Sequence, residues 1–209
     1  MLIRVHPETP QTRFVEQVAQ ILRNDGLVVY PTTSGYALGC LASSHKGRDR
    51  LYKLKGKDKA KVMALLFHDF AHIAQYARVS NFAFRTMKSV LPGAYTFILP
   101  SLNRTAKLLE SKRPEVGVRM PTHPLLTTLL PLLDGPLLST AARFTADPTE
   151  EHLSGEDVQE RYGHLVDAVV DAGEIVPLGT TIVSLVQESV ELVRKGQGPL
   201  DPLGLVEED

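Results

Sequence analysis

The sequence predicts a single α/β domain built around a mixed sheet. Short apolar runs of strand length alternate with segments whose apolar residues recur at the helical period. The last strand-like segments follow one another without a helix between them, which favours a mixed sheet over a wholly parallel one. A length of 209 residues suits one domain, and no repeat or low-complexity linker divides the chain.

The first helix is expected at residues 11–24, because apolar residues stand at i, i+4, i+7 and i+8 from Phe14. Thr9 is a candidate N-cap for this helix, and Gly26 is a stop signal just beyond it. The next expected elements are a buried strand in 27–32 that ends at Pro31, a basic helix at 45–55, a strand at 62–67, helices at 69–77 and 80–90, and a strand at 94–99.

In the second half, residues 116–120 are expected to form a strand that Pro121 ends. Residues 123–133 are expected to be helical, with Pro131 near the end. Further strands are expected at 136–140, 166–171, 180–186 and 190–195. The domain is predicted to span residues 1–200, and residues 201–209 to form a frayed C-terminal tail.

The charge distribution is uneven although the formal net charge is only −1. Residues 46–61 hold eight Lys or Arg against two Asp, a net charge of +6. Residues 146–174 hold nine Asp or Glu against one Arg, a net charge of −8. The basic stretch suits a phosphate-bearing ligand or an ordinary solvated face. The acidic stretch is expected to be a solvated helix with its flanking loop.

Several protein classes are excluded by composition. No apolar run reaches the roughly 18 residues of a membrane helix, and the first residues lack the apolar region of a signal peptide. One cysteine excludes an intramolecular disulfide and a Cys-cluster zinc site. A soluble, cytoplasmic protein is therefore expected.

The common motifs of nucleotide-binding, catalytic and metal sites do not identify a site in this chain. The chain has no Walker A motif, no G-x-G-x-x-G fingerprint and no G-x-S-x-G elbow. Cys40 is more simply a buried thiol than a nucleophile. His68 and His72 have the i, i+4 spacing of a zinc helix, but Asp69 replaces the usual Glu and no third ligand is evident. No protein-ligated metal is expected.

Polar residues next to predicted strands are stronger candidates. Thr32, Thr33 and Ser34 follow a strand and lie near two glycines, which suits a small polar ligand or phosphate, or an ordinary turn. Arg119 is a cation within an apolar strand, so it needs an anionic partner, either a ligand or an internal carboxylate. The further candidates are Ser139, Thr140 and Arg143, at the end of another strand, and the lysines of segment 51–61.

These segments together resemble the YrdC/YciO family of threonylcarbamoyl-AMP synthase-like proteins. PTTSGYALG resembles the family's P-T-E-T-x-Y-G-L-G stretch, and LYKLKGKDKAKVMALL resembles its lysine-x-arginine segment. PGAYTFIL and VGVRMPTHP resemble its P-G-x-x-T-x-I-L and V-G-V-R-x-P-x-H-P segments. PLLSTAAR stands at its T-S-A-N stretch, and TTIVSL…VELVRKG resembles its final hairpin. The matches occur in family order from about residue 10 to residue 200.

The resemblance implies a twisted mixed sheet, flanked by helices, around a basic concave cavity. It also implies a nucleotidyltransferase-like reaction, in which ATP, threonine and bicarbonate give threonylcarbamoyl-adenylate and pyrophosphate for the threonylcarbamoyladenosine modification of tRNA. Mg²⁺ is expected to accompany ATP. Catalysis would come from positioning and charge neutralisation, because a carbamate anion must approach a polyphosphate.

The resemblance also assigns roles to residues. Catalytic roles fall to Lys55, Lys57 and Arg119. The threonine-binding residues are Thr32, Ser34, Arg119, Thr140 and Thr180, with Arg119 pairing with the carboxylate. The nucleotide-binding residues are Lys55, Lys57, Lys61, Ser139 and Arg194.

The chain departs from the family pattern at certain positions. Thr33 stands for the family Glu, Lys57 for the Arg of the lysine-x-arginine pair, and Ala141 and Arg143 for the Ser and Asn of T-S-A-N. Segments such as SNFAFRTMKSVLPGAYTFIL resemble the YciO branch more than the YrdC branch. Two hypotheses follow: a threonylcarbamoyl-AMP synthase or close variant, and a double-stranded RNA- or nucleotide-binding, translation-associated protein without full synthase activity. A third, simpler hypothesis is an α/β domain in which Arg119 pairs with an internal carboxylate and the lysines form a solvated face.

Overall fold

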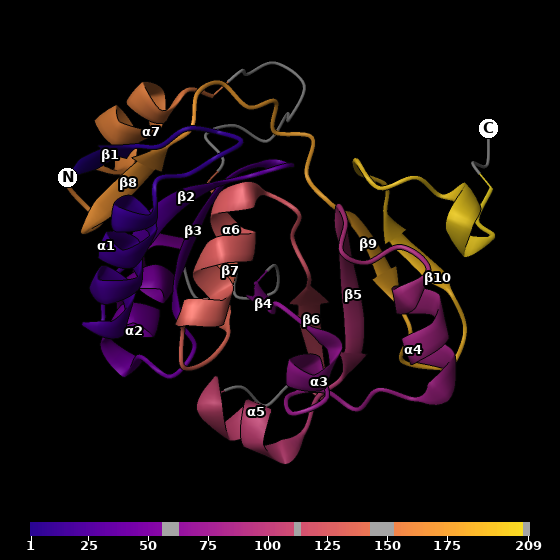
Figure 1. Cartoon of the computed structure of the whole chain (residues 1–209). Coiled ribbons are helices and arrows are strands. Elements are labelled where there is room, and N and C mark those ends of the chain that lie inside the picture. Colours follow the sequence, from indigo (N-terminus) through magenta and orange to yellow (C-terminus); the bar gives the residue numbers. More distant parts are fainter. Residues whose placement is uncertain (56–62, 111–113, 143–152, 207–209) are drawn as a thin grey trace.

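A computed structural model describes residues 1–55, 63–110, 114–142 and 153–206, and within these the strands form one mixed sheet (Figure 1). The sheet has ten strands in the order β1-β8-β2-β3-β7-β4-β6-β5-β9-β10. The strands are β1 (Leu2–Arg4), β2 (Val28–Thr32), β3 (Gly35–Leu41), β4 (Ala64–Leu66), β5 (Tyr95–Pro100), β6 (Glu115–Arg119), β7 (Leu137–Ala141), β8 (Ala168–Asp171), β9 (Thr181–Ser184) and β10 (Glu191–Arg194).

The pairing confirms the α/β class and the mixed sheet. Pairs β1–β8, β8–β2, β4–β6 and β5–β9 are parallel, and the other five neighbouring pairs are antiparallel. The helices are α1 (Thr12–Arg23), α2 (His45–Lys55), α3 (Phe70–Ile73), α4 (Asn81–Lys88), α5 (Asn103–Leu108), α6 (Pro124–Leu129) and α7 (Gly155–Tyr162), with 3₁₀-helices η2 (Leu130–Leu132) and η3 (Asp201–Leu203).

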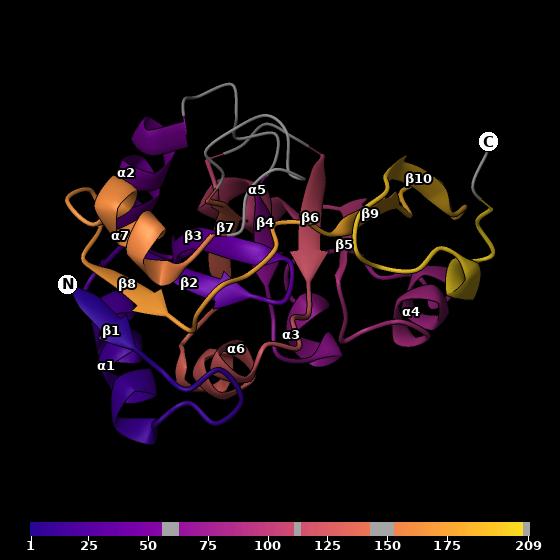
Figure 2. The same ribbon diagram turned by 90° about the horizontal axis from the view of Figure 1, so that it is seen from above.

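Helices cover both faces of the sheet, which is why most strands read as continuous apolar runs. Helices α1 and α6 bury Val18, Leu22 and Leu126 in a core on one face. Helices α2 and α7 bury Leu51 and Val158 in a core on the other. Figure 2 shows α1 and α6 on one side of β2 and β3, and α2 and α7 on the opposite side.

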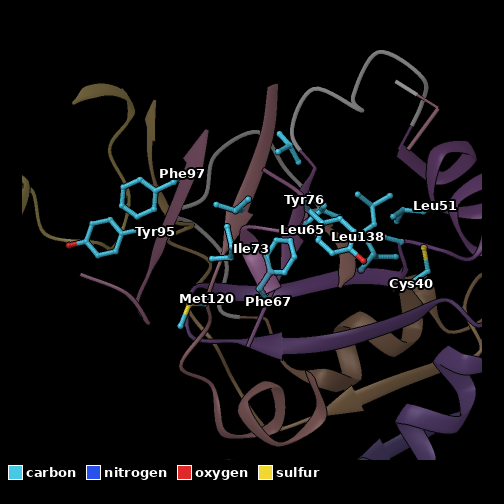
Figure 3. Packing of buried hydrophobic residues seen from close by; sticks show 14 of the residues in the cluster. Cys40, Leu51, Leu65, Phe67, Ile73, Tyr76, Tyr95, Phe97, Met120 and Leu138 are labelled. Carbon is cyan, nitrogen blue, oxygen red and sulfur yellow. The ribbon is translucent and has the colours of Figure 1, made fainter. Parts of the chain in front are cut away.

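Successive residues of a central strand therefore belong to different cores. In β3, Leu38 and Cys40 enter the core that contains Leu51, whereas Ala37 and Leu41 enter the core that contains α1. Figure 3 shows part of the first core, with Cys40 and Leu51 at one end and aromatic rings further along. This alternation decides which face each polar residue of a strand reaches.

The expected helices and strands are present, with shorter bounds in several cases. The helix expected at 69–77 contains only one helical turn, α3. Helix α1 has Gln11 and not Thr9 at its N-cap position. β1, β3 and α5 are present in addition to the elements predicted from the sequence. Strand β3 escaped notice because its glycines suggested a loop, whereas Gly35 with φ of 122° closes a tight β2–β3 hairpin.

Residues 201–206, the described part of the predicted tail, contain a helical turn. Residues Asp201–Leu203 form η3, and Leu203 is buried against the core that contains Leu51. Within the described ranges, no helix is long and apolar enough to cross a membrane.

Candidate functional site

The β2–β3 hairpin holds two of the predicted hydroxyls. Thr32 ends β2 and lies opposite Gly35 across the hairpin. Its Oγ1 donates to the Gly35 carbonyl at 2.6 Å and accepts from the Ser34 backbone N–H at 3.2 Å. Both side chains are buried. The Thr32 hydroxyl thus fixes the turn, which leaves the Ser34 hydroxyl to face its other neighbour, Arg119.

Arg119 ends β6, and the strand alternation turns it away from the core that receives Val118. Its Nη2 donates to Ser34 Oγ at 3.3 Å. Its Nε is buried and has no hydrogen-bond partner. No described carboxylate lies within 4.0 Å of the guanidinium, since the ion pairs of the described ranges involve other cations.

The surroundings disfavour the charge of Arg119. Burial lowers its pKa, and the nearby positive charge of Arg194 lowers it further. Arginine nevertheless stays protonated in proteins, so the site holds a cation for which the described residues supply no anion. The alternative that Arg119 is paired with an internal carboxylate finds no support in the described residues.

Ser139 joins this group through a buried tyrosine. It lies on β7, opposite Gly39 of β3 and Ala64 of β4. The Tyr30 hydroxyl donates to Ser139 Oγ at 2.6 Å. Burial raises the pKa of Tyr30, and the nearby Arg119 charge opposes that rise. The phenol is therefore neutral and close to Arg119.

Thr180 and Arg194 reach the same region from the other end of the sheet. Thr180 directly precedes β9, and its Oγ1 lies 2.7 Å from Thr96 Oγ1 on β5. Arg194, which ends β10, donates from Nη2 to the Thr180 carbonyl at 3.0 Å. The Gly179 N–H donates to the Ser34 carbonyl at 3.1 Å, so this segment is tied to the hairpin.

The structure thus brings together six of the predicted site residues from four separate parts of the chain. They are Thr32, Ser34, Arg119, Ser139, Thr180 and Arg194. Thr140 is buried but follows Ser139 on β7, so it points to the opposite face with its partner Leu38. The structure does not bring Thr140 to Ser34 and Arg119, and its role in threonine binding stays a prediction.

Of the three lysines predicted to bind the nucleotide, the structure describes one, Lys55. Lys55 ends α2, and its Nζ is 6.0 Å from the centre of the Tyr162 ring. Lys57, Lys61 and Arg143 lie outside the described residues. The resemblance implies a basic concave cavity. The part of that cavity which Lys57, Lys61 and Arg143 would line stays a prediction.

Sequence reasoning missed Tyr30 and Thr96. Tyr30 stands two residues before Thr32, on the same face of β2, so strand alternation was a usable signal. Thr96 is a lone hydroxyl in the apolar strand β5. Its partner Thr180 is 84 residues away in the sequence, so no local pattern could have connected the two.

The residues excluded as reactive or metal-binding have structural roles. Asp69 caps α3 by accepting from the His72 backbone N–H at 2.6 Å. The described residues contain no group of three or more His, Cys, Asp or Glu that could hold a metal ion. Burial raises the pKa of the Cys40 thiol to about 12, so the thiol stays protonated near neutral pH.

A protein-family model described as telomere recombination, and named for Sua5, YciO and YrdC, matches residues 20–196. The chain belongs to this Sua5/YciO/YrdC family. Its relatives include an uncharacterized Haemophilus influenzae protein, 36% identical over 95% of this chain and 96% of the relative. The uncharacterized protein YciO of Escherichia coli K12 is 34% identical over 95% and 96% of the two chains. The predicted resemblance to the YciO branch is thereby confirmed.

The synthases of the Sua5/YciO/YrdC family are also similar. The human threonylcarbamoyl-AMP synthase is 31% identical over 78% of this chain, which spans 60% of that protein. The E. coli YciO crystal structure has a TM-score of 0.87 at 32% identity and covers 97% of this chain and 98% of its own. The P. abyssi Sua5 structure complexed with L-threonine has a TM-score of 0.85 at 24% identity, covering 96% and 59%, and shows a common fold.

Proposed function

We propose that this chain is a threonylcarbamoyl-AMP synthase-like enzyme that binds threonine through Arg119. The single observation that carries the proposal is a buried guanidinium that has no anionic partner among the described residues. Its Nε is buried without a partner, and within the described residues the guanidinium donates one hydrogen bond, to the neutral hydroxyl of Ser34. A buried charge with no counter-charge is costly, and a ligand carboxylate offsets that cost. An α-amino acid supplies such a carboxylate.

Two relatives support threonine as the substrate and threonylcarbamoyl-AMP as the product. The P. abyssi Sua5 of the same fold was solved with L-threonine. The human relative is named threonylcarbamoyl-AMP synthase. Hydroxyls suited to the polar side chain of threonine surround Arg119, since Ser34 contacts its guanidinium and Thr32 contacts Ser34.

The proposed reaction needs threonine, bicarbonate and ATP. The threonine amine and bicarbonate combine to a carbamate with loss of water. A carbamate oxygen then attacks the α-phosphorus of ATP, and the bond to the β-phosphate breaks to release pyrophosphate. Arg119 holds the threonine carboxylate away from the reacting end, while Ser139 and Arg194 face the nucleotide. We assign the phosphates to Lys55, Lys57 and Lys61 from the sequence alone.

Mg²⁺ enters this proposal as part of the ATP complex. The described residues offer no cluster of carboxylates or imidazoles to hold a resident ion. The phosphate oxygens are hard ligands that Mg²⁺ prefers, so the ion belongs to the substrate.

Pyrophosphate release tests the proposal. Purified protein receives ATP, Mg²⁺ and bicarbonate, with or without threonine, and a threonylcarbamoyl-AMP synthase run in parallel validates the conditions. We expect threonine-dependent pyrophosphate from the wild type. Arg119→Lys keeps the charge but loses the bidentate fork, so its KM for threonine should rise about tenfold. Arg85→Lys, on exposed α4, is the matched control. No threonine-dependent release by the wild type would refute the enzyme.

A separate observation favours RNA binding as a second candidate function. Residues 70–109 contain five Lys or Arg and no Asp or Glu. All five are exposed, and none is within 4.0 Å of a carboxylate in the described ranges: they are Arg78, Arg85, Lys88, Arg104 and Lys107. Phe84 lies among them, 39% exposed, with Lys88 Nζ 5.7 Å from its ring centre. Unpaired cations beside an exposed ring suit a nucleic-acid backbone and its bases.

A further inference from the structure

The Tyr30 hydroxyl is a buried group for which the proposed reaction has no use. Tyr30 is fully buried on β2, and its hydroxyl donates to Ser139 Oγ at 2.6 Å. We propose that Tyr30 is a positioning residue, which turns the Ser139 hydroxyl into a donor aimed at the phosphates of a bound nucleotide. This inference rests on the proposed function, because Ser139 is assigned there to the nucleotide.

The inference begins with the direction of the hydrogen bond from Tyr30 to Ser139. A serine oxygen has one proton to donate and two lone pairs to accept with. Tyr30 occupies one lone pair, so the Ser139 proton must point elsewhere. No described group accepts that proton, since the bond from Tyr30 is the one side-chain hydrogen bond that Ser139 makes there. A buried donor without an acceptor is unfavourable, and a ligand oxygen satisfies it.

Arg119, the neighbouring cation, supplies the second observation. Arg119 also presents a buried donor, its Nε, without an acceptor. Tyr30 lies close enough to Arg119 for the two to influence each other's pKa. Two unsatisfied donors and a positive charge in one region match an oxygen-rich anion, because such a ligand accepts from both and offsets the charge.

The sheet register places small residues beside Ser139 and Arg119. Ser139 lies opposite Ala64, which lies opposite Gly117 on β6. Arg119 follows Gly117 by two residues, so it projects from the same face. The row from Ser139 to β6 therefore carries only the methyl group of Ala64 and the glycine, while Leu66 lies opposite Arg119 in the next row.

A glycine also makes the Tyr30 contact possible. A Cβ at Gly39 would stand 2.6 Å from the Tyr30 hydroxyl and 2.9 Å from the Leu138 carbonyl. Any larger residue at this position would push the phenol off Ser139. The β3 strand therefore contributes the space through which Tyr30 reaches its partner.

A double-mutant cycle on MgATP binding tests the inference. The variants are Tyr30→Phe, Ser139→Ala and the pair, with affinity measured by calorimetric titration of MgATP. Each single change should weaken MgATP binding about five- to tenfold, the range of one neutral hydrogen bond. The pair should be no weaker than Ser139→Ala alone, because Tyr30 acts only through Ser139. A purely structural role for Tyr30 would instead give losses that add.

Tyr36→Phe is the matched control. Tyr36 is also buried, and its hydroxyl donates to the Gly173 carbonyl at 2.7 Å, but it belongs to the opposite core. It should lose stability as Tyr30→Phe does, and keep its MgATP affinity.

The outcomes for the variants separate this inference from the proposed function, and the outcome for the wild type tests both. Additive losses, or an unchanged affinity of Tyr30→Phe, would overturn the inference while leaving the enzyme in place. If Tyr30→Phe does not fold, an unchanged MgATP affinity of Ser139→Ala overturns it by itself. Failure of the wild type to bind MgATP would overturn both proposals.

Discussion

Arg119 is a cation that the fold surrounds without supplying an anion among the described residues. Arg48 makes a useful contrast, because it is also buried but donates to Glu110 at 2.8 Å and to the Ala42 carbonyl at 2.7 Å. Within the described part of the chain, the fold thus gives one buried arginine a carboxylate and gives the other the Ser34 hydroxyl. A group that destabilises the free protein and stabilises a complex is typical of a binding site.

Arg119→Met tests this trade between stability and binding. Methionine fills a similar volume without a charge, so the unfolding free energy of the ligand-free protein should stay equal or rise by about 1 kcal/mol. Threonine affinity should fall at least tenfold, because the carboxylate loses its partner. Urea unfolding with and without threonine measures both. A stability loss above about 2 kcal/mol would mean that Arg119 has a structural anion after all.

His123, four residues after Arg119, makes the stability of the fold depend on pH. It is buried at the N-cap of α6, where its Nδ1 accepts from the Leu125 backbone N–H at 3.2 Å. Burial lowers its pKa from 6.5 to about 4. The unfolded chain therefore binds a proton in this pH window and the folded protein does not. Stability is full above about pH 6.5 and falls by up to roughly 3 kcal/mol as the pH drops to 4.

His123→Asn isolates this contribution, because asparagine can also cap a helix but does not titrate. The difference in unfolding free energy between the two proteins should vary with pH between 4 and 6.5 and be constant above that window. Denaturant unfolding at a series of pH values measures it. A difference that does not change with pH would show that His123 titrates normally.

At the scale of elements, the site depends on segments that meet only in the folded sheet. Strand alternation and the apolar runs predicted β2, β6 and β9 from the sequence, and the lone charge in an apolar strand identified Arg119. The β3 strand and the Tyr30–Ser139 contact could not be predicted in the same way. Glycines weaken strand patterns, and Tyr30 and Ser139 are 109 residues apart.

Gly196 illustrates such a meeting of distant segments. A Cβ there would stand 2.3 Å from the Thr180 carbonyl carbon, which is backbone and cannot move aside. Gly196→Ala should therefore displace Thr180 and cost about 2 kcal/mol or more of unfolding free energy. It should also weaken threonine binding, since Thr180 shares a hydrogen bond with Thr96 and is a proposed ligand residue.

Gly135→Ala is the control for that substitution. The nearest atom to a Cβ at Gly135 is the Tyr76 hydroxyl at 3.7 Å, which is ordinary contact. This variant should keep its stability within about 0.5 kcal/mol and bind threonine normally. Equal effects of the two alanines would contradict the steric explanation.

At the scale of the whole molecule, the structure changes the picture of where positive charge is available. The sequence pointed to residues 46–61, but in the described part of that stretch Arg48 pairs with Glu110 and Arg50 with Asp167. The acid-free segment 70–109 was not noticed, because none of its short stretches is strongly basic. It contains α3, α4, β5 and α5, and the three helices lie in the lower half of the view in Figure 1.

Charge reversal locates the surface that RNA would use. Arg85→Glu with Lys88→Glu alters exposed α4, and Lys46→Glu with Lys53→Glu makes the same change in charge on exposed α2. Because the α2 cations lie among carboxylates, we expect the α4 pair to weaken binding of a short RNA duplex more. Each phosphate contact that is lost should flatten the slope of log K against log salt by about 0.9. Titrations at several salt concentrations measure the slope. Binding that ignores salt, or an equal response of the two pairs, would remove the physical basis for RNA binding by α3, α4 and α5.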